Sequence, residues 1–168
     1  MTVTTDPLVL NSAGRGITDL GSATDPVTRA KILGVLAISL LDHGTIDDFA
    51  TIIAPEAINR PGCYAPAACQ TTGPSAVYAT SMWLRRTFSD LKWTIRALSA
   101  DESRVVVRAD MTGRHTGDLV LHRDDGLPYR TLRPTHVRFT VTRTYRFRIA
   151  DARIIERSVD FGELGPEE

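Results

Sequence analysis

Apolar positions in the first half of the chain recur with the 3.6-residue period of α-helices. The segment 27–41 is apolar on almost every side, which is typical of a buried helix, and Asp25-Pro26 before it is a typical helix start. The segments 45–53 and 75–87 predict two further, shorter helices. The pattern therefore predicts three helices in this half of the chain.

From residue 91 onward the period changes to the two-residue alternation of β-strands. The alternating segments are 91–98, 103–112, 117–122, 135–149 and 153–161. Residues 59–72 are rich in Pro and Gly and predict a loop, while Asp124-Asp125-Gly126 predicts a turn. Three helices followed by four to six antiparallel strands indicate an α+β fold whose helices cover one face of the sheet.

Length and composition are those of one globular domain. The chain has 168 residues, of which 42% are hydrophobic and 24% charged, an ordinary balance for a soluble protein. We divide it into a flexible N-terminal arm at 1–24, a folded domain at 25–162 and a polar tail at 163–168. The arm is assigned from its richness in Thr, Ser, Gly and Asp.

Charge and cysteine content narrow the class of partner. Lys and Arg number 20, as do Asp and Glu, so the formal net charge of zero argues against nucleic acid as a partner. No apolar run approaches the roughly 18 residues of a membrane helix, which argues against a membrane partner. Cys63 and Cys69 match no metal-binding or disulfide pattern. We therefore expect free thiols, no metal site and a cytoplasmic location.

Four segments, taken in order, resemble one family. They are Ala57-Ile58-Asn59-Arg60, the run 83–93, the pair formed by 104–108 and Gly113-Arg114-His115-Thr116-Gly117, and the hairpin 145–156. Together they resemble the SnoaL-like polyketide cyclases of the nuclear-transport-factor-2-like superfamily, over residues 26–161.

The resemblance implies a fold, a reaction and an assembly. The implied fold is a curved antiparallel sheet wrapped by three N-terminal helices into a cone-like barrel with a central pocket. The implied reaction is ring closure of a polyketide-like small molecule in secondary-metabolite biosynthesis, by general acid–base catalysis in an apolar pocket and without a cofactor. The implied assembly is a homodimer formed through the outer face of the sheet.

The last predicted strand supplies the candidate catalytic carboxylates. Glu156, Ser158 and Asp160 share one face because side chains alternate along a strand. The resemblance places a catalytic acid near the end of this strand, so Asp160 is the first candidate and Glu156 the second. An apolar pocket would raise the pKa of such a carboxyl toward the working pH. The alternative is that this face is plain solvent-exposed surface.

His115 is the third catalytic candidate. The resemblance supports it because some family members use a histidine in the Gly113–Gly117 segment, and an imidazole can exchange a proton near neutral pH. A histidine–carboxylate pair across neighbouring strands would suit acid–base work. The alternative is a surface histidine in a polar turn.

The strand at 135–149 carries a charge on its apolar face. Arg143 interrupts that face, which costs free energy unless the charge is paired or solvated. It either marks a β-bulge or reaches into a polar pocket. Tyr145 is either a core residue or a pocket residue whose hydroxyl holds an enolate or carbonyl oxygen. The other candidates for substrate binding, at the pocket mouth, are Asn59, Arg60, Tyr64, Tyr78 and Trp83; Tyr78 and Trp83 are more commonly core residues.

Departures from the family pattern keep alternative functions open. Arg60 stands where a histidine is common, Ala152 where a glycine is usual, and the connector 122–133 is long, which suggests a lid or a substrate-specific loop. A carbon–carbon-forming cyclase is the main hypothesis. An acid–base enzyme that opens an epoxide or forms a cyclic ether is the second, and a non-catalytic ligand-binding or dimerisation domain is the third.

Overall fold

The three predicted helices are all present in the described part of the chain. The computed structural model describes residues 8–9, 25–62 and 64–160; the tail 163–168 and most of the arm lie outside the described residues. The helices are α1 (Pro26–Ser39), α2 (Ile46–Ile52) and α3 (Gly73–Thr87). Asp25 caps α1 by accepting a hydrogen bond from the Thr28 backbone N–H at 3.0 Å.

The helices pack against a curved six-stranded sheet in the order β1-β3-β4-β7-β8-β2, of which β1 precedes α1 and β2 lies between α2 and α3. The bounds are β1 Leu8–Val9, β2 Ile53–Arg60, β3 Phe88–Ala100, β4 Arg104–His115, β7 Arg138–Ala150 and β8 Arg153–Asp160. The α+β class is confirmed. One expectation is wrong: the sheet is not wholly antiparallel, because β2 pairs in parallel with β8. The sequence pattern did not predict β2. Only four of its eight positions are buried or half-buried, and it contains Pro55, a residue that is uncommon inside strands.

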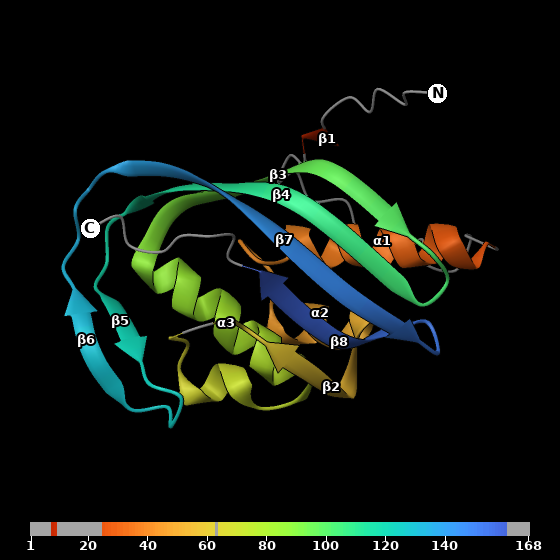
Figure 1. The fold of residues 1–168 in the computed structure, drawn as a ribbon, viewed down its shortest axis with the longest axis horizontal. Coiled ribbons are helices and arrows are strands. Elements are labelled where there is room, and N and C mark those ends of the chain that lie inside the picture. Colours follow the sequence, from red (N-terminus) through yellow and green to blue (C-terminus); the bar gives the residue numbers. More distant parts are fainter. Residues whose placement is uncertain (1–7, 10–24, 63, 161–168) are drawn as a thin grey trace.

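The long connector forms a second, two-stranded sheet. Strands β5 (Leu119–His122) and β6 (Pro128–Leu132) pair across the predicted turn at 124–126. This hairpin packs beside α3, where the Trp83 indole N–H donates to the Val120 carbonyl at 3.3 Å. It also meets the loop before the short 3₁₀ helix η1 (Ala67–Gln70), where the His122 backbone N–H donates to the Tyr64 carbonyl at 2.9 Å. Figure 1 shows the hairpin at one end of the molecule.

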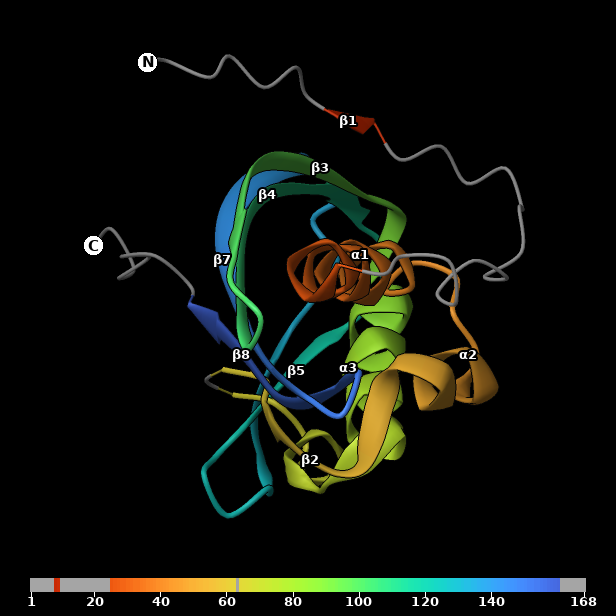
Figure 2. The same ribbon diagram turned by 90° about the vertical axis from the view of Figure 1, so that its right-hand side faces the viewer.

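The core lies where the sheet curls around α1. Figure 2 shows β3, β4 and β7 arching over this helix, with α3 and α2 beside it. Gly34 permits the close approach of α1 to β4, since a Cβ atom at this position would lie 2.7 Å from Cγ1 of the fully buried Val105. The inner face of the sheet is thus the face that the helices cover.

The register of β8 decides which of its side chains face inward. Glu156 pairs with Arg148 but Ile154 pairs with Ile149, so Ile155 is the extra residue of a β-bulge. Beyond the bulge, Arg157 lies opposite the buried Phe147 on the inner face. Glu156, Ser158 and Asp160 lie opposite Arg148, Arg146 and Thr144 on the outer face.

Candidate functional site

A polar cluster lies on the inner face of the otherwise apolar sheet. Its members come from three strands of the sheet's centre and one of its edge strands: Trp93 (β3), Tyr145 (β7), Arg157 (β8) and Asn59 (β2). All four are buried, with 2% of Arg157, 3% of Tyr145, 4% of Trp93 and 6% of Asn59 exposed. Arg157 is the only charged side chain that is buried among the described residues. Buried polar groups in this number need partners, and the cluster supplies most of them.

Two hydrogen bonds and one cation–π contact join the cluster. The Trp93 indole N–H donates to the Tyr145 hydroxyl oxygen at 2.7 Å, and Nη1 of Arg157 donates to Oδ1 of Asn59 at 3.1 Å. The Arg157 guanidinium carbon lies 5.7 Å from the centroid of the Tyr145 ring. Burial raises the pKa of Tyr145, so its phenol stays protonated at neutral pH.

Asn59 is held in one orientation by two elements. Its amide Nδ2 donates to the Cys69 carbonyl at 2.7 Å and to Oγ1 of Thr80, on α3, at 3.0 Å. Both donor hydrogens are therefore used, and Oδ1 is left to accept from Arg157. The local chain fold thus fixes the guanidinium from one side.

Burial decreases along the inner face from this cluster toward one end of the sheet. Arg143, two residues from Tyr145 on the same face, is half-buried. The apolar residues around it are also only partly buried: Leu91, Phe139, Val141 and Val159. Both Arg143 and Arg157 act electrostatically on the Tyr145 hydroxyl. The cluster therefore lies between the fully buried core and a partly buried apolar part of the inner face.

The two predicted catalytic carboxylates lie on the opposite face. Oε1 of Glu156 accepts from Nε of Arg60 at 3.0 Å, and Oε2 lies 3.2 Å from Nη1 of Arg148. The hydrogen bond from Arg60, ahead of that from Arg148, lowers the pKa of Glu156. The expected rise of this pKa in an apolar pocket is wrong, because the alternation of β8 turns Glu156 toward surface arginines.

Asp160 follows the same register. It forms an ion pair with Arg146, and its side chain is 60% exposed. The prediction that it faces a pocket is wrong in this structure for the same reason as for Glu156. Among the described residues, no Asp or Glu side chain is buried.

His115 ends β4 outside the cluster, beside Phe88, whose ring also lies 4.8 Å from that of Phe139. Its Nδ1 lies 3.4 Å from the backbone N and from Oγ1 of Thr135, and its ring centroid is 5.7 Å from that of Phe88. Its other ring nitrogen, Nε2, is buried and has no hydrogen-bond partner among the described residues. Along β4, Met111, the partner of Trp93, lies four residues before His115, and Val107, the partner of Tyr145, lies eight, paths of about 13 Å and about 26 Å at 3.3 Å per residue. The predicted histidine–carboxylate pair is therefore not formed among the described residues.

Comparison with known proteins fixes the family. The model of the SnoaL-like polyketide cyclases matches residues 34–163, more than half of the chain. The chain belongs to this family. None of the curated proteins compared matches the sequence.

Solved structures share the fold of this SnoaL-like chain. TsrD from Streptomyces laurentii matches with a TM-score of 0.63 and 21% identity, over 82% of this chain and 91% of that one. A protein from Jannaschia sp. CCS1 assigned to the SnoaL-like polyketide cyclases matches with a TM-score of 0.60 and 18% identity, over 88% and 90%. A protein with a ketosteroid isomerase-like fold from Catenulispora acidiphila DSM 44928 matches with a TM-score of 0.54 and 12% identity, over 77% and 84%.

The residues predicted to bind substrate in this SnoaL-like protein lie in several different places in the structure. Asn59, Arg143 and Tyr145 are on the inner face, as described above. Arg60 is on the outer face with Glu156, and Tyr64 is 52% exposed, with its ring 5.9 Å from that of Tyr129. Tyr78 is half-buried against Phe49 and the core, and Trp83 fastens the hairpin to α3. Of the seven predicted binding residues, Asn59 and Tyr145 thus belong to the cluster, Arg143 lies next to it on β7, and the other four lie elsewhere.

Sequence analysis missed Arg157 and Trp93. The signal for Arg157 was present, since it alternates with Ile155 and Val159 on a strand face that is otherwise apolar. It is the same signal that singled out Arg143. Trp93 carried no signal beyond a β-strand pattern, because only the fold brings it to Tyr145, 52 residues away.

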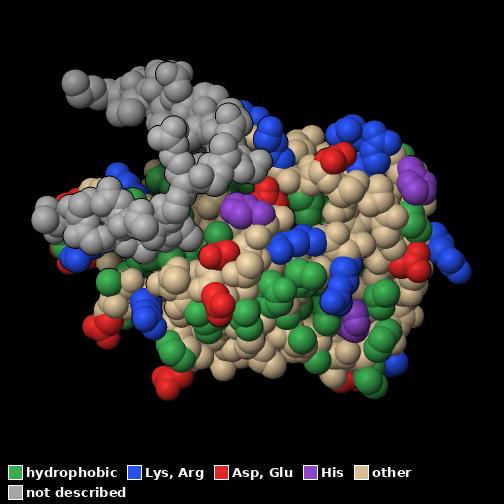
Figure 3. Space-filling view, turned by 180° about the vertical axis from the view of Figure 1, so that it is seen from behind, with side chains coloured by type: hydrophobic (Ala, Val, Ile, Leu, Met, Phe, Trp, Pro, Cys, Tyr) green, Lys and Arg blue, Asp and Glu red, His purple; other side chains and the backbone are tan. Residues whose placement is uncertain are grey.

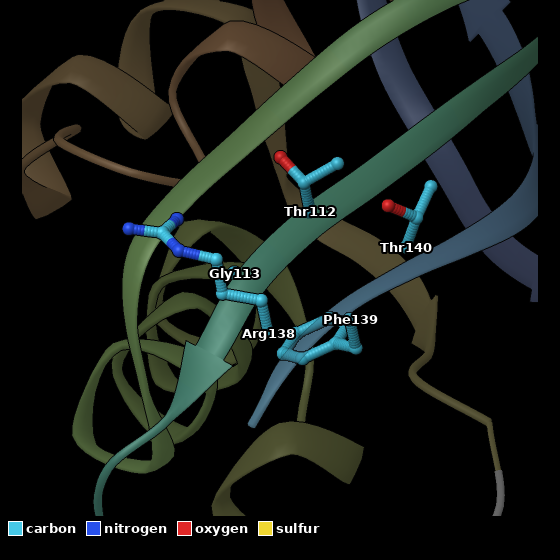
Figure 4. Close-up of a pocket in the computed structure, with 5 residues that line it drawn as sticks. All are labelled: Thr112, Gly113, Arg138, Phe139 and Thr140. Carbon is cyan, nitrogen blue, oxygen red and sulfur yellow. The ribbon is translucent and has the colours of Figure 1, made fainter. Parts of the chain in front are cut away.

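A depression of about 190 Å³ lies elsewhere on the sheet, where β4 and β7 pair. Its lining residues are Thr112, Gly113, Arg138, Phe139 and Thr140. Figure 4 shows the two threonines pointing to the same side and Phe139 to the other. No buried charged group lines this depression, so its chemistry is poorer than that of the inner cluster.

The surface and the described helices limit other classes of site. On the face shown in Figure 3, basic and acidic side chains are interspersed. Within the described ranges, no three His, Cys, Asp or Glu side chains are grouped so as to hold a metal ion. None of the helices described is both long and apolar enough to cross a membrane. Of the two cysteines, Cys69 is a buried free thiol and Cys63 lies outside the described residues.

Proposed function

We propose that this chain is an enzyme that closes a ring in a polyketide-like small molecule on the inner face of its sheet. Family membership supports a cyclase-type activity. The observation that carries the assignment of the site is the Trp93–Tyr145 hydrogen bond at 2.7 Å in a buried, largely apolar setting. Such a site stabilises negative charge on a substrate oxygen more strongly than water does.

Tyr145 is the proposed proton donor. The Tyr145 hydroxyl oxygen already accepts a hydrogen bond from Trp93. The hydroxyl hydrogen of Tyr145 can therefore be donated to a substrate. Burial keeps the phenol protonated by raising its pKa. As the proton moves to a substrate, the Trp93 N–H and the positive charges of Arg157 and Arg143 stabilise the oxygen left behind.

The proposed reaction is an intramolecular aldol closure. A carbon between two carbonyl groups loses a proton to solvent and becomes an enolate. The enolate carbon attacks a ketone carbon of the same molecule, a carbon–carbon bond forms, and the ketone oxygen becomes an alkoxide. Tyr145 donates its proton to that alkoxide and is reprotonated from solvent, so the net change is an isomerisation. Proton transfer of this kind requires no redox cofactor.

The test is turnover with open-chain substrates. We would supply β-diketones and β-keto esters that carry a ketone positioned for six-membered ring closure, together with matched epoxy alcohols. Products would be identified by liquid chromatography–mass spectrometry and NMR. We expect carbon–carbon closure by the wild type and a loss of about 100-fold or more in kcat/KM for Tyr145→Phe, the size of effect seen when one oxyanion donor is removed.

Matched controls separate this role from a structural one. Tyr129→Phe removes an equivalent hydroxyl from an exposed residue of β6 and should leave kcat/KM unchanged. Near-ultraviolet circular dichroism would establish that Tyr145→Phe retains native packing. Wild-type rates in Tyr145→Phe would contradict the assignment. Turnover of the epoxy alcohols alone would favour cyclic-ether formation, and no turnover of any substrate would favour a binding domain.

Homodimerisation through the outer face is part of the same proposal. Thr140, Thr142 and Thr144 alternate with inward-facing residues along β7 and present hydroxyls on that face. Analytical ultracentrifugation would measure the oligomeric state directly. A monomer at micromolar concentration would contradict this part of the proposal.

A further inference from the structure

We propose that Arg157 is the receptor for a carboxylate group of the ligand, so that the substrate of this enzyme is a free acid rather than a neutral ester or amide. This inference rests on the proposed function, because it names a subsite within the same inner-face cluster. Only 2% of Arg157 is exposed, and its guanidinium has no carboxylate partner among the described residues.

Among the described residues, no group around Arg157 balances its charge. Its ionisable neighbours are Tyr145 and Cys69, and burial raises the pKa of both, so both are neutral at physiological pH. Burial also lowers the pKa of Arg157, yet a guanidinium does not deprotonate in proteins. A buried cation without a counter-ion is strongly disfavoured, and an anion that binds beside it removes that penalty.

The hydrogen bonds of the guanidinium leave one edge for a ligand. Asn59 accepts from Nη1, and Asn59 is itself fixed by its bonds to Cys69 and Thr80. The edge formed by Nε and Nη2 is the one that pairs side-on with a planar carboxylate. On that edge, Nε is buried and has no hydrogen-bond partner among the described residues. The geometry therefore provides an oriented donor edge.

The neighbouring side chains define the rest of the ligand. Tyr145 is directly beside Arg157, so an acid held by the guanidinium presents its nearest carbon atoms to the proposed proton donor. The partly buried apolar residues of the inner face suit an aromatic or aliphatic body: Leu91, Phe139, Val141 and Val159. Arg143, half-buried and two residues from Tyr145 on β7, adds a second positive charge near Tyr145, which favours an anion there.

Binding of simple acids tests the subsite without turnover. The probes are formate, acetate, benzoate and 2-naphthoate, with benzamide and 2-naphthamide as neutral matches of the two larger acids. Affinity would be measured by isothermal titration calorimetry and by ligand-induced change in Tm. We expect the wild type to bind at least one aromatic acid about tenfold or more tightly than its amide, a difference set by the charge-assisted pair.

Variants of arginines in β8 test whether Arg157 causes the preference for acids over amides. Arg157→Met should abolish the preference for acid over amide. Arg153→Met, which removes an exposed arginine from the start of the same strand, should retain it. Arg157→Lys keeps the charge but loses the side-on edge, so its preference should fall between the two. This variant also serves if Arg157→Met does not fold.

Two results would overturn the inference. One is that none of the four acids binds or stabilises the wild type above a chloride control of equal ionic strength. The other is that the preference for acids persists in Arg157→Met or is undiminished in Arg157→Lys. The outcome is separable from the proposed function: Arg157-dependent acid binding without ring closure leaves the subsite standing, whereas equal turnover of acidic and neutral substrates removes the subsite alone.

Discussion

Replacing Glu156 with Gln tests which face of β8 belongs to the active site. The substitution keeps the size of the side chain and removes its charge. In the structure it eliminates two ion pairs, at 3.0 Å with Arg60 and 3.2 Å with Arg148. Both arginine side chains are more than half exposed, so each pair contributes no more than about 0.2–1 kcal/mol.

We therefore expect Glu156→Gln to lower the free energy of unfolding at pH 7 by about 1 kcal/mol, summed over both pairs. For a chain of this length that corresponds to a fall in Tm of about 2–4 °C. The difference should shrink in about 1 M NaCl, where the screening length is only about 3 Å. Glu102→Gln, at an exposed carboxyl without an ion pair among the described residues, is the matched control and should change Tm little.

The pH dependence has a defined sign. The folded-state pKa of Glu156 lies below its ordinary value of 4.5, so the native state binds this proton less readily than the unfolded state. The stabilisation is therefore complete above pH 4.5 and is lost as the pH falls through the lowered pKa. Wild type and Glu156→Gln should differ in Tm at pH 7 and converge in strong acid.

Activity provides the decisive comparison for Glu156. Because the carboxylate faces surface arginines, ring closure by Glu156→Gln should remain near the wild-type rate. A fall of about 100-fold in kcat/KM, the loss typical of a missing acid–base group, would show that Glu156 acts on the substrate. A Tm difference that does not change between pH 7 and strong acid would refute the ion-pair argument as well.

Two predictions concern the scaffold. Gly34→Ala gains about 1 kcal/mol of helix propensity, but its Cβ would lie 2.7 Å from the stiff side chain of Val105, at a cost of about 1–3 kcal/mol. We therefore expect urea denaturation to show a lower free energy of unfolding for this variant. Adding Val105→Ala should restore part of that loss. Arg85 donates hydrogen bonds of 2.9 Å to the carbonyls of Leu40, Leu41 and Gly44, beyond the end of α1. Arg85→Met removes these bonds, so Tm should fall by several degrees. An unchanged Tm would mean that water replaces the side chain at these carbonyls.

Local pattern was sufficient for most of the elements of the fold. The period of 27–41 and the cap at Asp25 predicted α1, and the alternation of 135–149 predicted β7, because both elements bury one continuous set of apolar residues. The strand β2 was missed because Asn59, an inward-facing residue, is polar, and because its pairing with β8 joins segments about a hundred residues apart. Non-local pairing leaves no local signature.

The site was less predictable because it depends on register. The alternation of β8 correctly grouped Glu156 with Asp160 and Arg157 with Val159, but it could not say which group faces the helices. The carboxylates were chosen as the pocket face by resemblance. The pairing of Arg157 opposite the buried Phe147 assigns the other group to the interior.

This register changes the kind of chemistry that the interior supports. An interior with a carboxylate can remove a proton from carbon, whereas the polar cluster and the neighbouring Arg143 offer a phenol, an indole N–H and guanidinium groups, all of which stabilise anions. Such a site accelerates reactions of substrates that are already acidic, because their enolates form readily and need only to be held and reprotonated. A β-dicarbonyl acid meets both demands, since its carbon acid ionises easily and its carboxylate satisfies Arg157. The absence of a buried carboxylate in the described residues and the presence of a buried arginine therefore point to the same substrate.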